Sequence, residues 1–332
     1  MFATLLGAYP PAPEPMSDDE LVRGVVAELE EAGLEPLTDG QVRRRTALAD
    51  WPIDPDAVVA EWRFAAAATD RAVKQSLPGP YTIARDGLPG RRHSSGPIER
   101  PQSGRDAADS PANAALAGER LREVVAALAA AGCQLVEIEE PAAIRIGDDE
   151  AERGHFIDAH RRLTGGLASS IHLSLVLTGG NADTAGASTF FDLPYASYAF
   201  DLIAGPDNWR LIAEAPGDRG IICGALDPSA GSNDVPETLV WAAHYAASTG
   251  GRGLDRVGLA NASSLVALDR ERARAKLKLV ADAARIASAA TPDELARLLD
   301  PRAVDIRSAA MGRYEKPRPR RPFDRPDRNR GG

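Results

Sequence analysis

Cysteine, long apolar runs and nucleotide-binding glycine motifs are scarce or absent in this sequence. Its two cysteines, Cys133 and Cys223, lie in separate apolar segments without metal-like spacing, which predicts small core residues and no disulfide. No apolar run reaches the roughly 20 residues that span a bilayer, and the Pro-rich start lacks the basic end and apolar centre of a signal peptide. We therefore expect a cytoplasmic protein that does not bind membranes.

Charge is unevenly distributed along the 332 residues. The formal net charge is −9, but residues 313–330 carry eight Lys or Arg against three Asp or Glu, so the rest of the chain is at −14. An acidic body of this kind disfavours nucleic-acid partners. The Pro-rich, basic segment 313–332 predicts a disordered tail, either solubilising or partner-binding, and residues 86–113 predict a long internal loop.

Helical and apolar extended segments alternate along the remainder, and 44% of the residues of the whole chain are hydrophobic. Ser17 and Glu20 form a capping box, Asp54 with Pro55 opens another helix, and residues 112–131 predict a third. Eight segments read as strands: 3–9, 34–40, 73–83, 133–141, 169–177, 197–203, 219–226 and 255–263.

Near-continuous apolar strands alternating with helices indicate a parallel sheet. Eight such units predict an α/β fold, a (βα)₈ TIM barrel, in one domain over residues 1–312. A doubly wound open sheet is the alternative. It is disfavoured because neither G-x-G-x-x-G nor G-x-x-x-x-G-K-[ST] follows any predicted strand.

Polar side chains follow the predicted strands at the points where they end. In a (βα)₈ barrel these ends converge on one mouth, where the reaction site lies. Because side chains alternate along a strand, one of Glu139 and Glu140 should point inward and the other toward the helices, with Glu137 on the side of Glu139. The alternative is that these carboxylates cap helices or pair with Arg145.

Six segments in order, "LLGAYP", "LTDGQVRR", "VKQSLPGPYT", "CQLVEIEEPAA", "YAFDLIAG" and "GALD", carry a family resemblance. The chain resembles the barrel of cobalamin-independent methionine synthases over roughly residues 3–290. Some members of that family carry the barrel twice, whereas this chain has room for one copy. The resemblance implies an enzyme with its site at the strand ends.

The residues that the resemblance assigns to zinc are mostly replaced. Ser174 and Val176 stand where the family has His and Cys, Asp201 takes the acidic place, and Ser263 stands where the second Cys belongs. Valine has no donor atom and hydroxyls hold Zn²⁺ weakly, so zinc is not expected. His155 and His160 are five residues apart and do not share a helical face, which disfavours a displaced site.

Two further family roles are altered. Gln41 stands where the family has the glutamate assigned to a substrate amino group, and Ser229 stands where it has its proton-donating histidine. Glu139 replaces an aspartate and keeps the acid. These departures count against homocysteine methylation, although paired carboxylates at the mouth can still act as general acid and base.

The sequence therefore predicts a divergent, zinc-independent relative of methionine synthase without a resident cofactor. We expect a transfer or lyase reaction on a small polar substrate that is amino-acid-like, a thiol or folate-like. The expected catalytic residues are Glu139, Asp201 and Asp227. The expected substrate-binding residues are Tyr9, Asp39, Gln41, Arg44, Lys74, Tyr81, Ser174 and Ser263.

Several alternatives remain open on the sequence. The chain could be a metal-free enzyme resembling uroporphyrinogen decarboxylase, or a barrel that binds a ligand or partner without catalysis. Arg44 and Lys74 could hold an anionic substrate group or form structural ion pairs. His172 is expected to be a core histidine. The oligomeric state is open, with a homo-oligomer among the alternatives.

Overall fold

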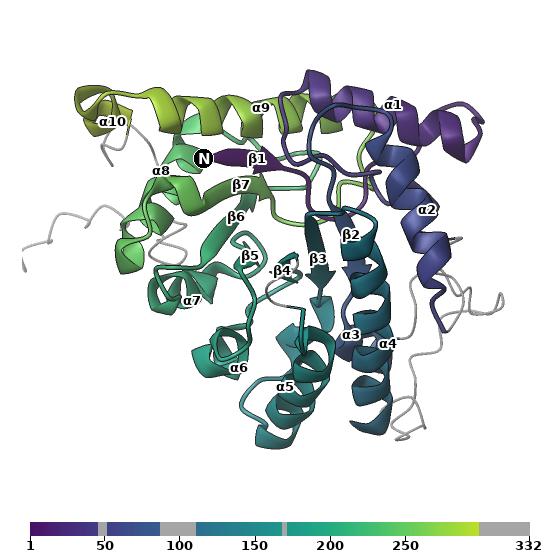
Figure 1. Ribbon diagram of the computed structural model, residues 1–332. Helices are drawn as coiled ribbons and strands as arrows, with labels where there is room; N and C mark the ends of the chain where they lie inside the picture. Colours follow the sequence, from purple (N-terminus) through teal and green to yellow (C-terminus); the bar gives the residue numbers. More distant parts are fainter. Residues whose placement is uncertain (46–51, 87–110, 168–170, 299–332) are drawn as a thin grey trace, which may run out of the picture.

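The computed structural model describes residues 1–45, 52–86, 111–167 and 171–298. Within them, seven parallel strands form one curled sheet in the order β1-β7-β6-β5-β4-β3-β2 (Figure 1). The sheet and its alternation with helices confirm the α/β prediction. The strands are β1 (Phe2–Thr4), β2 (Gln75–Pro78), β3 (Leu135–Glu139), β4 (His172–Leu177), β5 (Ser197–Asp201), β6 (Gly220–Leu226) and β7 (Val257–Asn261).

Helices surround the curled sheet (Figure 1). They are α1 (Asp18–Glu31), α2 (Pro55–Ala66), α3 (Pro80–Asp86), α4 (Pro111–Ala130), α5 (Glu150–Thr164), α6 (Ala187–Phe191), α7 (Trp209–Glu214), α8 (Pro236–Ser248), α9 (Arg270–Ala289) and α10 (Pro292–Leu298). Short 3₁₀ helices span Val42–Arg45, Pro141–Arg145, Asp183–Ala185, Pro206–Asn208, Thr249–Gly251 and Leu254–Arg256. In the described part of the chain, no helix is long and apolar enough to cross a membrane.

The predicted helix starts are confirmed. Ser17 and Glu20 form both bonds of the capping box at α1, and the Asp54 side chain accepts a hydrogen bond from the Asp56 N–H at the start of α2. The predicted extended segment 73–83 is wrong beyond Pro78, because Pro80 begins α3. Proline at a first helical turn loses no intrahelical hydrogen bond, which favours this early start.

The predicted long loop and tail fall mostly outside the described residues. Residues 87–110 and 299–332 are not described, and the two ends of the expected loop are helical, since α3 runs to Asp86 and α4 begins at Pro111. The prediction of a disordered tail over residues 313–332 therefore stays a prediction.

The expected second strand, residues 34–40, is not a regular strand. It forms isolated bridges instead, from Glu35 to Ala3 of β1 and from Leu37 to Val73 next to β2. Pro36 lies between these bridges and has no N–H to donate, which interrupts any ladder. The described residues therefore form seven regular strands, and this segment connects the two edges of their sheet.

Two different surfaces pack on the two faces of the sheet. Large side chains such as Phe156, Tyr198 and Phe200 fill the space between the strands and the outer helices. The face enclosed by the curl, called the interior face below, carries a small apolar cluster of Leu6, Val176, Ala199, Ile222 and Ala260.

A buried ion pair crosses the interior face. Lys74 Nζ donates to Glu137 Oε1 at 2.6 Å and to the Leu5 carbonyl at 2.8 Å, while Ser76 Oγ donates to Glu137 Oε2 at 3.1 Å. Burial raises the pKa of Glu137, and the Lys74 charge opposes that rise. The pair links the residue before β2 to the residue after β1 and to the middle of β3.

We predict that Lys74→Met destabilises the fold by about 3–5 kcal/mol, because it leaves the Glu137 carboxyl buried without its cation. Urea unfolding measures this loss. The double variant Lys74→Met/Glu137→Leu removes both charges and should recover more than half of it. A single variant that loses less than about 1 kcal/mol would contradict a bracing role for the pair.

Candidate active site at the carboxyl ends of the strands

Glu139 and Gln41 meet at the carboxyl end of the sheet. Glu139 is the last residue of β3 and is 8% exposed, and its Oε1 accepts a hydrogen bond of 2.5 Å from Gln41 Nε2. The Gln41 N–H donates to Asp39 Oδ1 at 2.9 Å, and the Tyr9 N–H donates to the Gly40 carbonyl at 3.0 Å. Three predicted site residues, Asp39, Gln41 and Glu139, are thus brought together.

The turn that carries Gln41 has an unusual backbone. Gln41 has a φ of 58°, in the left-handed region that residues with a side chain rarely adopt. Gly40 precedes it with a φ of 69°, and a Cβ there would come within 2.9 Å of Tyr9 Cβ. The turn is therefore packed tightly against the segment after β1, and this packing aims Gln41 at Glu139.

Glu140 points to the opposite face of the sheet. Its oxygens accept hydrogen bonds from the Tyr81 N–H (2.9 Å), the Thr82 N–H (2.7 Å) and Thr82 Oγ1 (2.5 Å), and its Oε1 lies 3.0 Å from His160 Nε2. This arrangement confirms that the two carboxylates point to opposite faces, with Glu139 inward and Glu140 toward the helices. Glu140 holds the first turn of α3 against the strands.

Asp201 and Asp227 also follow strands, but they organise backbone. Asp201 is 1% exposed and accepts hydrogen bonds from the N–H groups of Gly179 (3.0 Å), Ile203 (2.9 Å) and Ala204 (2.8 Å). Burial raises the pKa of Asp201, and these N–H groups oppose the rise. Asp227 Oδ1 accepts from the Ser229 N–H at 2.8 Å. Both carboxylates shape the loops around the mouth.

The two predicted tyrosines direct their hydroxyls toward outer helices. Tyr9 donates to Glu28 of α1 at 2.8 Å, and Tyr81 donates to Glu152 of α5 at 2.6 Å. Burial and these carboxylates raise the pKa of both phenols, so both stay protonated. Their hydroxyl hydrogen bonds do not involve Glu139.

The remaining predicted residues lie at different depths. Lys74 is in the interior with Glu137, as described above.

Ser174 is fully buried on β4 in register with Glu137, and its hydroxyl has no hydrogen-bond partner among the described residues. Ser263 follows β7 and accepts from Asn261 Nδ2 through its carbonyl at 2.7 Å. Arg44 lies in the 3₁₀ helix Val42–Arg45, and its side chain is outside the described part.

The four positions that the family resemblance assigns to zinc do not fit a metal. Val176 offers no donor and packs in the interior apolar cluster with Ala199 and Ile222. The Asp201 oxygens already accept backbone N–H groups. Among all described residues, no group of three or more His, Cys, Asp or Glu is placed to hold a metal ion.

Two features escaped prediction from the sequence. His160 is buried between Glu140 and the Tyr195 hydroxyl, at 2.6 Å from the latter, and no sequence motif marks this pairing across three elements. A cavity of about 910 Å³ opens at the amino ends of the strands, opposite the predicted mouth. The expectation of a core His172 is wrong, because its side chain is exposed to this cavity.

Comparison with known proteins supports the resemblance. No protein-family model matches the chain. A B12-independent methionine synthase from Shewanella sp. W3-18-1, solved in complex with selenomethionine, superposes with a TM-score of 0.64 at 15% identity, over 86% of this chain and 97% of that one. This chain has the fold of that synthase. A methyltransferase from Methanosarcina mazei superposes with a TM-score of 0.56 at 15% identity, over 87% of this chain and 95% of that one.

Sequence similarity to a curated relative is confined to one segment. A 5-methyltetrahydropteroyltriglutamate–homocysteine methyltransferase of Rhodopseudomonas palustris (strain TIE-1) is 34% identical over 155 residues, which cover 43% of this chain and 18% of the relative. The match therefore spans less than a fifth of that methyltransferase. Its name describes the relative, and the activity of this chain is a separate question.

We predict that Glu140→Ala destabilises the protein more than Glu139→Ala does. Removing the Glu140 carboxylate leaves the Tyr81 and Thr82 N–H groups buried without acceptors, at about 1–3 kcal/mol for each. Chemical unfolding of the two variants side by side measures the difference. Equal losses would show that Glu140 does not anchor α3.

Proposed function

We propose that this protein is a group-transfer enzyme, a divergent relative of cobalamin-independent methionine synthase that acts without zinc. Its substrate would be small and polar, and its reaction site would lie at the carboxyl ends of the strands. The observation that carries the proposal is the Gln41–Glu139 contact, which joins the turn after residues 34–38 to the end of β3. We also propose that residues 34–38 serve as the second strand of a (βα)₈ barrel.

Transfer is favoured over a lyase reaction because of what the similar proteins are. The three relatives named above are described as methionine synthases or methyltransferases. Their names are the support for a transfer reaction, while the fold alone is compatible with many chemistries.

Glu139 is proposed as the general acid and base. Its carboxyl lies in a largely buried position, where a charge interacts more strongly with a bound substrate than it would in water. Gln41 would orient this carboxyl and present its carbonyl oxygen to a substrate N–H. Asp39 would hold the turn, and Asp201 and Asp227 would keep the surrounding loops in place for the substrate.

Without a metal, the choice of substrate narrows on energetic grounds. An ordinary thiol has a pKa near 8.5 and an ordinary glutamate one near 4.3, so moving a proton between them costs about 6 kcal/mol. A zinc ion would remove that cost, but Val176 and the engaged Asp201 do not fit one. A thiol substrate would therefore need another group to lower its pKa.

We expect Glu139→Gln to lower kcat by about 10²- to 10⁴-fold with a smaller change in KM, because the variant keeps the shape of the side chain and loses its proton. Mass spectrometry can follow methyl transfer from a methylfolate donor to a panel of amino-acid-like and thiol acceptors. Glu150→Gln, an exposed change at the start of α5, is the matched control. Wild-type turnover in Glu139→Gln would refute the assigned role.

The purified protein should contain well below one zinc per chain, and its activity should survive treatment with a chelator. Elemental analysis and an assay before and after dialysis against EDTA test both points. One tightly bound zinc per chain, with activity lost on its removal, would overturn the metal-free proposal.

A further inference from the structure

The cavity at the amino ends of the strands is a separate site. Residues at the start of six strands line it. Five of them are the first residues of their strands and the sixth precedes β7: Phe2, Leu135, His172, Ser197, Gly220 and Arg256. Leu135 and Glu139 are the two ends of β3, so the cavity and the proposed reaction site lie about 13 Å apart along that strand. At about 910 Å³, its volume is in the range of ligand pockets.

Glycines allow close packing between neighbouring strands at this end of the interior face. Gly220 lies in register with Ser197, and Gly258 lies in register with Phe2. A Cβ at Gly258 would come within 2.5 Å of the Phe2 ring, and one at Gly220 within 2.9 Å of Ser197 Cβ. Bulky residues normally fill such layers in a closed barrel. Here His172, on the interior face of β4, stays exposed to the cavity.

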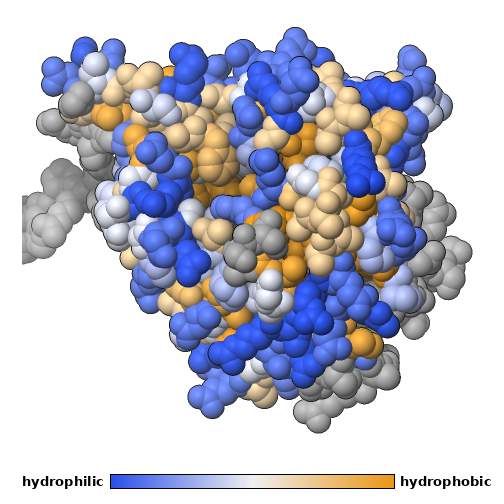
Figure 2. Space-filling model, in the orientation of Figure 1, coloured by the Kyte–Doolittle hydropathy of each residue, from blue (hydrophilic) through white to orange (hydrophobic). Residues whose placement is uncertain are grey.

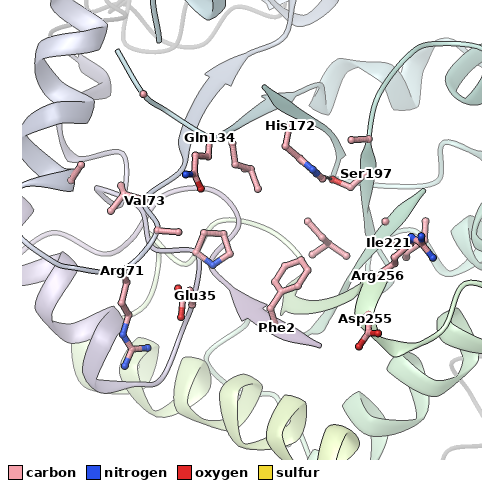
Figure 3. Close-up of a pocket in the computed structure, with 18 of the residues that line it drawn as sticks. Phe2, Glu35, Arg71, Val73, Gln134, His172, Ser197, Ile221, Asp255 and Arg256 are labelled. Atoms are coloured by element: carbon pink, nitrogen blue, oxygen red, sulfur yellow. Dashed lines mark hydrogen bonds between the residues drawn. The ribbon is translucent and has the colours of Figure 1, made fainter. Parts of the chain in front are cut away.

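His172 and Ser197 supply the polar floor of the cavity. His172 Nε2 lies 2.8 Å from Ser197 Oγ, and Ser197 is 4% exposed (Figure 3). Desolvation by the neighbouring protein lowers the pKa of His172. The ring is therefore neutral at neutral pH and does not repel a cation.

The cavity wall is acidic. Four carboxylates line it (Glu35, Asp70, Asp218 and Asp255) against two guanidinium groups (Arg71 and Arg256). Arg71 already pairs with Glu30 at 3.4 Å and donates to the Leu34 carbonyl, and Asp218 pairs with Arg219. Glu35, Asp70 and Asp255 form no ion pair with any described residue. The unbalanced charge favours a cationic ligand.

Aromatic and aliphatic groups complete the wall. The Phe2 ring and Glu35 lie on the same side of the cavity, and His172 with Ser197 lies across from them (Figure 3). Trp62, Val73 and Ile221 add further apolar surface. Figure 2 shows a hollow on the face drawn in Figure 1, with apolar surface inside and hydrophilic side chains around it. Aromatic faces next to carboxylates bind ammonium groups that carry an apolar body.

We propose that this amino-end cavity binds a small amphipathic organic cation, an aryl- or alkylammonium. The ammonium group would lie between Glu35 and Asp255, and the apolar body would pack against Phe2 and Trp62. This site does not depend on the proposed group-transfer function. Glu139→Gln should therefore leave cation binding unchanged, so the two proposals can fail separately.

Calorimetric titration of the full chain with 2-phenylethylamine tests the proposal, alongside 3-phenylpropionate as an anion of similar shape. We expect saturable binding of the amine and none of the acid. The double variant Glu35→Gln/Asp255→Asn should weaken amine binding about tenfold. The control is Glu31→Gln/Glu214→Gln, which removes two exposed carboxylates outside the cavity and should leave binding unchanged.

Proton NMR of the imidazole ring locates the ligand. The chain has five histidines, so a His172→Gln variant identifies the His172 signal. We expect that signal to shift during titration with the same dissociation constant as in calorimetry. The proposal is overturned if the amine does not bind, if the acid binds equally well, if the double variant binds like the control, or if the His172 signal does not move.

Discussion

Alternation of side chains along a parallel strand is the constraint that places the acidic groups of this molecule. On β3, it directs Glu137 and Glu139 to the interior face and Glu140 to the helices. The three carboxylates lie within four residues, yet one forms a buried ion pair, one meets a polar turn at the mouth, and one anchors a helix. A shift of one residue in strand register would exchange all three roles.

The same constraint explains why acidic residues at strand ends are not equivalent. Asp201 and Glu140 satisfy backbone N–H groups that would otherwise be buried without acceptors. Glu139 instead accepts from the side chain of Gln41, across 98 residues of sequence. A side-chain partner can move aside for a substrate more easily than a loop backbone can, and this difference singles out Glu139 among the carboxylates at this edge.

Local patterns in the sequence predicted the elements well. The capping box at Ser17, the Asp54 cap and the apolar segments of the seven strands were readable because each depends on neighbours a few residues away. The irregular backbone of residues 34–40 could not be predicted, because Pro36 lies between two isolated bridges to distant segments. The hydrogen bonds that engage Asp201, Glu140 and His160 were not readable either, because their partners come from distant parts of the chain.

The amino-end cavity escaped prediction for a related reason. Gly220 and Gly258 resemble ordinary strand glycines in the sequence, and only the register shows that they face Ser197 and Phe2. The lining of the cavity comes from separate strands and loops, which no local pattern in the sequence brings together. The sheet therefore offers a polar mouth at one end and an acidic, partly aromatic cavity at the other.

The most direct test of this account is a crystal structure of the protein soaked with methionine, as an amino-acid-like probe. The account predicts density for the amino acid at the carboxyl ends of the strands, with a polar atom within hydrogen-bond distance of Glu139 or Gln41. Density confined to any other part of the molecule, with the Gln41–Glu139 contact intact, would contradict a reaction site at that end.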